Sequence, residues 1–445
     1  YNWIKLLGFV NRGFMRFIGL FLLFFGATSS VLVAQNEDAF PVLIERVIVF
    51  GNEKTRDEVV LREIPFDFPA ELNLEDLQLI QNRLMNLFLF NRVELGIIGQ
   101  GDGKILTVQL TETWYVYPVP LLFINERDWS KVSYGFSLSH TNFRGMNEQL
   151  ALGGWLGFNP SFFMRYNNPW LGRNAKFIFG INAFGKMVGN KFFDFDERHI
   201  GGGVSLGKRL TLNTSVQLSA SVKRVEFPVE FRQFSVSGDR SDVVPQFGLQ
   251  IRTDKRDLFE YPRNGAYVKW NITRTGLTAN QPQFWRFNFD NRVYFKLHNR
   301  LSIGGKQLLT FNSVPESELP IYDRIFIGYG NRIRGYFDKI LTGRHLMMHH
   351  VEARIGLVPI RYLSWENAPV MPVFFQQLKY GLSLGLFVDS GTTWNHSEEL
   401  SLKNHFTGYG AGLHIHLPYI YLLRIDHAWS DTGDRQWIIE AGVSF

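Results

Sequence analysis

The stretch that decides the fold is KYGLSLGLFVDSG, residues 379–391. One alternate set of positions holds large apolar side chains: Tyr380, Leu382, Leu384, Leu386 and Val388. The other set is mostly small or polar: Gly381, Ser383, Gly385, Phe387 and Asp389. Successive side chains of a β-strand point to opposite faces, so this strand has one apolar and one polar face. Such alternation is typical of a transmembrane β-barrel, which meets lipid outside and water inside.

The same alternation runs through residues 114–445. It recurs in NTSVQLSASVK (213–223) and in QWIIEAGVSF (436–445), which groups Trp437, Ile439, Ala441, Val443 and Phe445 on one face. We expect about sixteen antiparallel strands, an even number that returns both ends of a barrel to one side. Their predicted starts are near residues 115, 131, 148, 161, 175, 198, 212, 243, 264, 283, 301, 345, 379, 407, 419 and 436. A soluble sandwich is the alternative, but it could not line its core with Lys and Glu.

The composition agrees with this fold and excludes several classes of protein. Of 445 residues, 15% are aromatic, yet the mean hydropathy is only −0.08, too low for a bundle of membrane helices. The chain has no cysteine, which excludes a disulfide scaffold, a Cys-ligated metal and a Cys nucleophile. Its formal charge of +6 is spread along the chain and gives no indication of a nucleic-acid partner.

The N-terminus carries the features of a secretory signal peptide. Arg16 precedes the apolar run FIGLFLLFF (17–25), which small residues follow. We expect a signal peptide over residues 15–34, starting at Met15, with residues 1–14 as an upstream extension. An N-terminal anchor helix is the alternative.

Residues 41–113 predict a small α+β domain. A strand over 42–52 precedes a helix that Thr55 opens, with Glu58 at capping-box spacing. A second helix over 73–88 leads into a hairpin of 91–98 and 104–110. This order resembles a POTRA domain, although other small α+β domains share it. The resemblance implies a periplasmic module whose free edge strand can bind an extended peptide.

The longest connection, residues 313–344, contains GYGNRIRGYF with Arg334, Gly335 and Tyr336 at its tip. This tip resembles the signature of the BamA/TamA-like superfamily of outer-membrane assembly and translocation proteins. Two further segments resemble its turn motifs, YNNPWLG (166–172) and TDKRDLFEYPRNG (253–265), with Pro169, Arg256, Asp257, Pro262 and Gly265. Glu352-Ala353-Arg354, FVDSG (387–391) and the aromatic end Phe445 also agree in order.

The resemblance implies that loop 313–344 folds into the barrel lumen. Independently, the alternation places Glu352 and Asp389 on the lumen face, where Arg334 could pair with them. Ordinary lumen charge is the alternative explanation of these two acids.

The first barrel strand contains Pro118 and Pro120, two residues apart, so both missing N–H groups belong to one edge. We hypothesise a weak seam between 115–124 and the closing segment 436–445, which includes Phe445. The alternative places both prolines in a linker below the barrel.

The sequence shows no catalytic constellation, so we expect no enzyme, no cofactor and no metal site. His349, His350, His414 and His416 suit polar lining better than metal binding. The resemblance implies an outer-membrane insertase or translocase whose partners are unfolded outer-membrane or secreted polypeptides, the lipid bilayer and accessory periplasmic proteins or lipoproteins. A single POTRA-like module leaves general assembly and specialised export both open. A passive solute pore and a periplasmic docking scaffold are the alternatives.

Overall fold

The computed structural model describes residues 40–99, 103–125, 128–172, 176–328, 331–336, 339–368, 372–443 and 445. The predicted signal peptide and upstream extension lie outside these residues. Within the described residues, no helix has the length and apolar character needed to cross a membrane. Leu43–Phe445 cluster into one compact unit, which contains both main sheets.

The N-terminal region is a small α+β domain of the POTRA-like type. Its sheet has the order β2-β1-β4-β3, with β1 and β4 parallel. The strands are β1 Val42–Phe50, β2 Ala70–Leu72, β3 Phe90–Ile98 and β4 Lys104–Glu112, and the helices are α2 Asp57–Leu61 and α3 Leu74–Met85. Leu77, Ile80 and Leu84 form the buried face of α3, as their helical spacing predicts.

The first helix begins differently from the prediction. Arg56, not Thr55, precedes α2, and no side chain caps that helix. The Thr55 hydroxyl instead hydrogen-bonds Tyr115 Oη at 2.9 Å. A capping box does occur at α3, where Asn73 and Asp76 satisfy each other's backbone N–H groups. The capping box predicted at Thr55 is therefore wrong because Thr55 is used for a tertiary contact.

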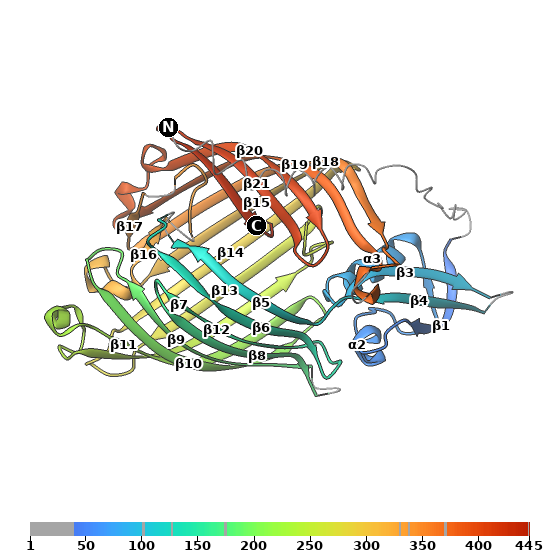
Figure 1. Ribbon diagram of the computed structural model, residues 1–445, viewed down its shortest axis with the longest axis horizontal. Helices are drawn as coiled ribbons and strands as arrows, with labels where there is room; N and C mark the ends of the chain where they lie inside the picture. Colours follow the sequence, from blue (N-terminus) through green and yellow to red (C-terminus); the bar gives the residue numbers. More distant parts are fainter. Residues whose placement is uncertain are drawn as a thin grey trace. The chain divides into compact units, whose positions relative to one another are not determined.

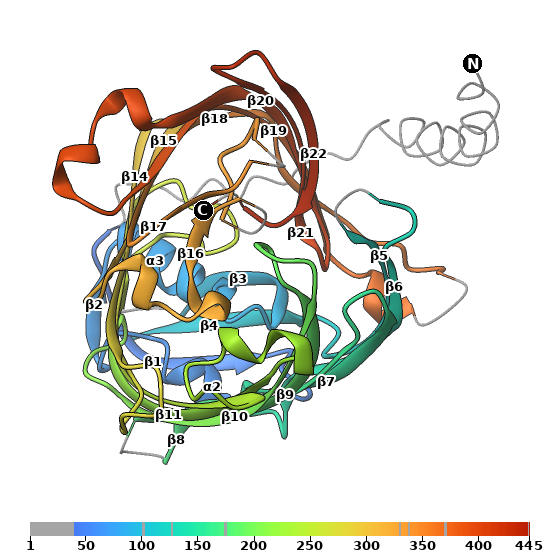
Figure 2. The same cartoon turned by 90° about the vertical axis from the view of Figure 1, so that its left-hand side faces the viewer.

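The larger sheet has sixteen strands, as the alternation predicted. They surround a central space when viewed end-on (Figure 2). Every strand begins within two residues of its predicted start. The strands are β5 Val116–Ile124, β6 Val132–Phe143, β7 Glu148–Gly157, β8 Ser161–Leu171, β9 Phe177–Gly189, β10 Asp196–Arg209, β11 Thr214–Glu226, β12 Ser241–Asp254, β13 Gly265–Thr275, β14 Phe284–His298, β15 Leu301–Asn312, β18 His345–Leu363, β19 Leu378–Trp394, β20 Phe406–Leu417, β21 Tyr421–Ser430 and β22 Arg435–Ala441.

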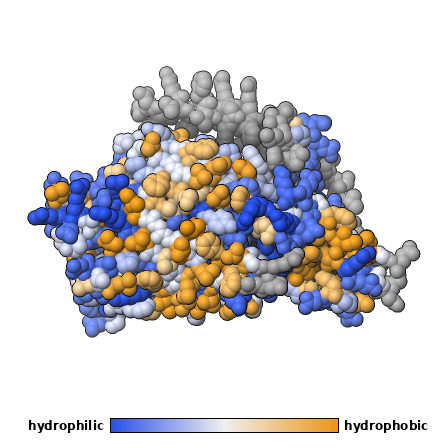
Figure 3. All heavy atoms as spheres, turned by 90° about the horizontal axis from the view of Figure 1, so that it is seen from below, coloured by the Kyte–Doolittle hydropathy of each residue, from blue (hydrophilic) through white to orange (hydrophobic). Residues whose placement is uncertain are grey.

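The strand faces divide as a membrane barrel requires. On β19, Leu386 and Val388 are exposed while Phe387 and Asp389 are buried. Apolar residues accordingly spread over the outer surface of the barrel (Figure 3). The lumen side carries the polar set, which explains a hydropathy near zero in a chain rich in phenylalanine.

Loop 313–344 contains two short strands, β16 Ile325–Ile327 and β17 Leu341–Gly343, that pair with each other. These strands lie inside the ring of barrel strands (Figure 2). Figure 1 shows them side by side near one end of the barrel strands. The connections also contain short 3-10 turns: Val229–Phe234, Glu316–Glu318, Ile321–Asp323, Pro372–Phe375, Ser397–Glu399 and Leu402–Asn404.

The two end strands of the large sheet each have one partner. Strand β5 pairs with β6, and β22 pairs with β21. Among the residues that the structure describes, no pairing joins β5 to β22. Pro118 and Pro120 both lie within β5, so their placement in a linker below the barrel is wrong.

The end of the chain departs from the predicted alternation. Strand β22 stops at Ala441, and Gly442 has a φ of +92°, a backbone conformation that favours glycine. Phe445 is buried, with its ring 6.1 Å from Tyr294 and 6.0 Å from His350. The expectation that Phe445 shares one strand face with Trp437 and Ile439 is therefore wrong, because those two side chains are exposed and Phe445 is buried.

Candidate functional site in the barrel lumen

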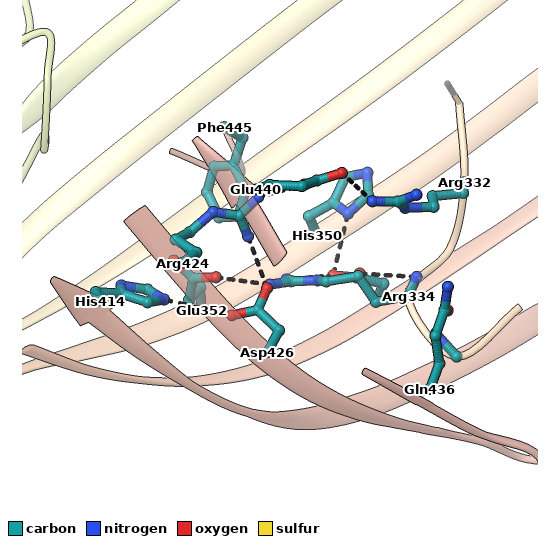
Figure 4. Close-up of polar contacts among 12 residues, drawn as sticks. Arg332, Arg334, His350, Glu352, His414, Arg424, Asp426, Gln436, Glu440 and Phe445 are labelled. Carbon is teal, nitrogen blue, oxygen red and sulfur yellow. Dashed lines mark hydrogen bonds and ion pairs between the residues drawn. The ribbon is translucent and has the colours of Figure 1, made fainter. Parts of the chain in front are cut away.

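Arg334 is the centre of a buried ion-pair cluster in the lumen (Figure 4). Its Nε and Nη2 donate to the two Asp389 oxygens at 2.6 and 2.8 Å, a bidentate arrangement. Its Nη1 donates to Glu352 Oε2 at 2.9 Å. The loop tip thus contacts both strand carboxylates that the alternation placed in the lumen.

Asp426 of β21 is a third carboxylate in this cluster. Arg334 Nη1 lies 3.3 Å from Asp426 Oδ2, which also accepts from Arg424 at 2.7 Å. The Arg334 guanidinium also stacks 3.4 Å from the centre of the Phe387 ring. Burial disfavours the Arg334 charge, but the carboxylates more than offset this and hold its pKa above the ordinary value. Arg334 is therefore a permanent cation in the cluster.

Gly335 and Tyr336 hold the loop tip in place, Gly335 through its backbone conformation and Tyr336 through an aromatic contact. Gly335 has a φ of +100°, and a Cβ there would lie 2.9 Å from the backbone of Trp429. Tyr336 is buried and stacks on Phe406 with ring centroids 4.7 Å apart. A side chain at position 335 would push the tip away from β21.

Arg354 links the cluster to the periplasmic half of the lumen. It is fully buried and donates to Glu352 Oε1 at 2.9 Å and to the Pro262 backbone oxygen at 2.8 Å. Its guanidinium also contacts the ring and backbone oxygen of Phe445. The turn segment 253–265 and Phe445 therefore both contact the Arg354 side chain.

The other turn-motif residues stabilise the strand connections. Arg256 forms a bidentate pair with Asp254, with both bonds at 2.8 Å. Asp257 accepts the backbone N–H of Arg263 at 2.9 Å, while Gly265 has a φ of +103°. In the other motif, the Pro169 oxygen accepts Arg209 Nε at 3.0 Å. Arg256, Asp257 and Gly265 thus stabilise the connection between β12 and β13, and the Pro169 contact joins β8 to β10.

The histidines divide between the two barrel faces. His350 points inward and lies 3.0 Å from Asp389, whereas its neighbour His349 faces outward. His414 and His416 are buried on the lumen side, where His414 Nδ1 hydrogen-bonds Tyr261 Oη at 2.9 Å. Within the described ranges, no group of three or more His, Asp or Glu residues could hold a metal ion.

Sequence reasoning missed Asp426, Arg424 and Tyr261. The segment YLLRIDHAWS (421–430) alternates as clearly as β19, so its parity could have placed Arg424 and Asp426 in the lumen. Tyr261 lies in a connection without alternation, and no sequence signal places it against His414. The whole arrangement anchors a loop inside the barrel by charge.

Comparisons with known proteins agree with this architecture. A family model described as the Omp85 superfamily domain matches residues 142–445. The outer membrane protein assembly factor BamA of Nitratidesulfovibrio vulgaris is 24% identical over 384 residues, 81% of this chain and 45% of that protein. The chain therefore spans about half the length of the curated relative it matches.

Two solved structures share the fold. The crystal structure of BamA from Haemophilus ducreyi lacking POTRA domains 1–3 has 18% identity and a TM-score of 0.53, covering 89% of this chain and 83% of that one. CdiB from Escherichia coli has 12% identity and a TM-score of 0.55, covering 93% and 78%.

Proposed function

Because the chain belongs to the Omp85 superfamily, we propose that it inserts unfolded polypeptides into the outer membrane or passes them across it. The chain resides in the bacterial outer membrane. The observation that carries the proposal is the seam, where neither β5 nor β22 has a second partner among the described residues. An unpaired strand edge in lipid is a template for another strand.

The direction of the β5 backbone supports this role. The Thr141 N–H donates to the Tyr115 oxygen, and the Asn125 N–H donates to the Lys131 oxygen, so odd-numbered positions bond β6. Even-numbered positions therefore direct their N–H groups toward the seam. Pro118 and Pro120 are even-numbered, so they remove two donors from the edge that would otherwise close the barrel.

The POTRA-like domain is proposed to receive the client. Its strand β3 pairs only with β4 among the described residues, which leaves an edge of nine residues for an added strand. In this proposal the client passes from the β3 edge to the barrel seam. Accessory periplasmic proteins or lipoproteins would act at the same stage.

Locking the seam tests the proposal. The chain has no cysteine, so single disulfides can be introduced between 116–124 and 435–441 without background. We expect oxidation to stop client insertion or secretion in living cells and reduction to restore it. A Leu138→Cys/Leu152→Cys pair is the control, because those residues face each other across the continuous β6–β7 ladder. Full transport with a closed seam disulfide contradicts the proposal.

Two other functions fit less well. A passive solute pore needs an open lumen, whereas Arg334 and β16–β17 occupy it. A docking scaffold would use the β3 edge but would not need a barrel with unpaired end strands. We therefore place transport ahead of both, and propose no catalytic role.

A further inference from the structure

A groove crosses the lipid-facing surface of β15, β18, β19 and β20. Its volume is about 440 Å³, which falls within the range of about 300–1,000 Å³ that small-molecule sites occupy. Ala353 pairs with Leu386, and Leu386 with Ala411, so two small side chains flank a large one across the strands. Val351 and Val388, each 51% exposed, form part of the lining.

A row of polar side chains borders this groove. Cross-strand pairing places Gln307 beside His349, His349 beside Ser390, and Ser390 beside Thr407. His349 lies two residues before Val351, and Ser390 two residues after Val388, so the row adjoins the groove on the same face. Ser390 Oγ also hydrogen-bonds His405 Nδ1 at 3.0 Å. On four neighbouring strands, the outward-facing side chains thus change from polar to apolar at the same level.

Two members of the row lack a partner. Within the described residues, neither the Gln307 amide nor the His349 ring forms a hydrogen bond, and both side chains are partly exposed on the outer face. At the level of the lipid head groups, both side chains are therefore open to hydrogen bonding by a ligand. A single ligand could hydrogen-bond these two polar side chains and also cover the apolar groove beside them.

The row belongs to the outer leaflet. Because the strands alternate in direction, β18 begins at the barrel end opposite to the start of β5, which follows the periplasmic domain. The groove ends at Tyr409 and Trp429, whose rings stack 6.1 Å apart. Such aromatic residues sit at head-group level in membrane barrels.

We propose that this surface binds one glycolipid of the outer leaflet. An acyl chain lies in the groove, and sugar hydroxyl or amide groups bond Gln307 and His349. The row contains neutral hydrogen-bonding side chains without Lys or Arg, so it suits hydroxyl and amide groups better than a bare phosphate.

The test measures retained lipid by native mass spectrometry of the full chain in phosphatidylcholine nanodiscs. One set of discs contains lipopolysaccharide, and the other contains phosphatidylethanolamine. Ala411→Trp fills the groove, whereas Gln307→Leu/His349→Leu removes the free polar groups. Ala220→Trp is the matched control, because Ala220 faces lipid on β11 between Val204 and Phe247. Heat-dependent gel mobility establishes that each variant is folded.

We expect the unmodified chain and Ala220→Trp to retain lipopolysaccharide equally. Ala411→Trp and the double polar variant should each retain about tenfold less. Equal retention by Ala411→Trp and Ala220→Trp overturns the groove as the site. Equal retention of phosphatidylethanolamine and lipopolysaccharide by the unmodified chain overturns the glycolipid as the occupant.

Discussion

The three carboxylates around Arg334 do not depend on it equally. Glu352 also pairs with Arg354, and Asp426 also pairs with Arg424. Within the described residues, His350 is the only other basic side chain close to Asp389, with its Nδ1 3.0 Å from an Asp389 oxygen. Loss of Arg334 therefore leaves Asp389 as the carboxylate with the weakest remaining partner.

Arg334→Ala should lower the free energy of unfolding by about 3 kcal/mol or more, because it leaves buried carboxylates uncompensated. Urea unfolding followed by gel mobility measures the change. Lys339→Ala is the control, since Lys339 of the same loop pairs with Asp434 and their side chains are 45% and 60% exposed, and exposed pairs contribute about 0–1 kcal/mol. Equal destabilisation by both variants would argue against the special role of the buried cluster.

A charge reversal of the Arg334–Asp389 pair would be difficult to interpret. In Arg334→Asp/Asp389→Arg, the aspartate at 334 would face Glu352 and Asp426 as well as the new arginine. Failure of that double variant would thus not disprove the pairing. Asp389→Asn, which keeps the shape, isolates the bidentate contact more cleanly.

At the level of the strand, β5 combines regular pairing on one side with missing donors on the other. Pro118 and Pro120 pair with Leu138 and Phe136 without disturbing the β5–β6 register. The two missing N–H donors therefore weaken hydrogen bonding only at the seam.

Pro118→Ala/Pro120→Ala should close the seam more firmly, because it restores two N–H donors there. We expect a higher yield of seam disulfides in cysteine variants and slower client insertion. Pro245→Ala is the control, since Pro245 lies in β12, between β11 and β13. Unchanged disulfide yield and insertion rate would show that the prolines do not weaken the seam.

Strands proved more predictable than their ends. The alternation of β19 or β11 is local, so each strand could be placed from its own residues. The short strands β2, β16 and β17 have three residues each, too few to show a period. Phe445 was misplaced because a single backbone turn at Gly442 reverses the face that parity assigns.

Within the site, the alternation of side chains along the strands placed Glu352 and Asp389 in the lumen, but it gave no distances between side chains. The contact of Arg334 with both followed only from the family resemblance, since nothing local fixes where a long loop folds. The Pro262 oxygen could not be predicted at all, because a backbone acceptor carries no residue signature.

Across the whole barrel, loop 313–344 is held at two levels. Arg334 anchors its tip, while Tyr322 Oη donates to Asp242 at 2.8 Å and Asp323 pairs with Lys223 at 2.8 Å. Phe195, Phe227 and Ile321 form a small apolar cluster around the second anchor. Displacing the loop therefore requires both anchors to release.

Tyr322→Phe/Asp323→Asn should raise ion conductance in planar bilayers modestly, because the tip stays anchored. Adding Arg334→Ala should raise conductance by more than the sum of the two separate effects, since the lumen then loses its occupant. Glu316→Gln/Glu318→Gln in the same loop is the control, as both acids lie outside these anchors. High conductance in the unmodified chain would instead favour a passive pore.

The alternating direction of the sixteen strands limits how many strands of a client can pair with both edges of the seam. Strands β5 and β22 run in opposite directions, because they are the first and last of an even, antiparallel series. A single guest strand between them would be antiparallel to one neighbour and parallel to the other. Only an even number of guest strands meets both edges in antiparallel order, so the hairpin, rather than the strand, is the smallest unit that the gap can accept without a mismatch.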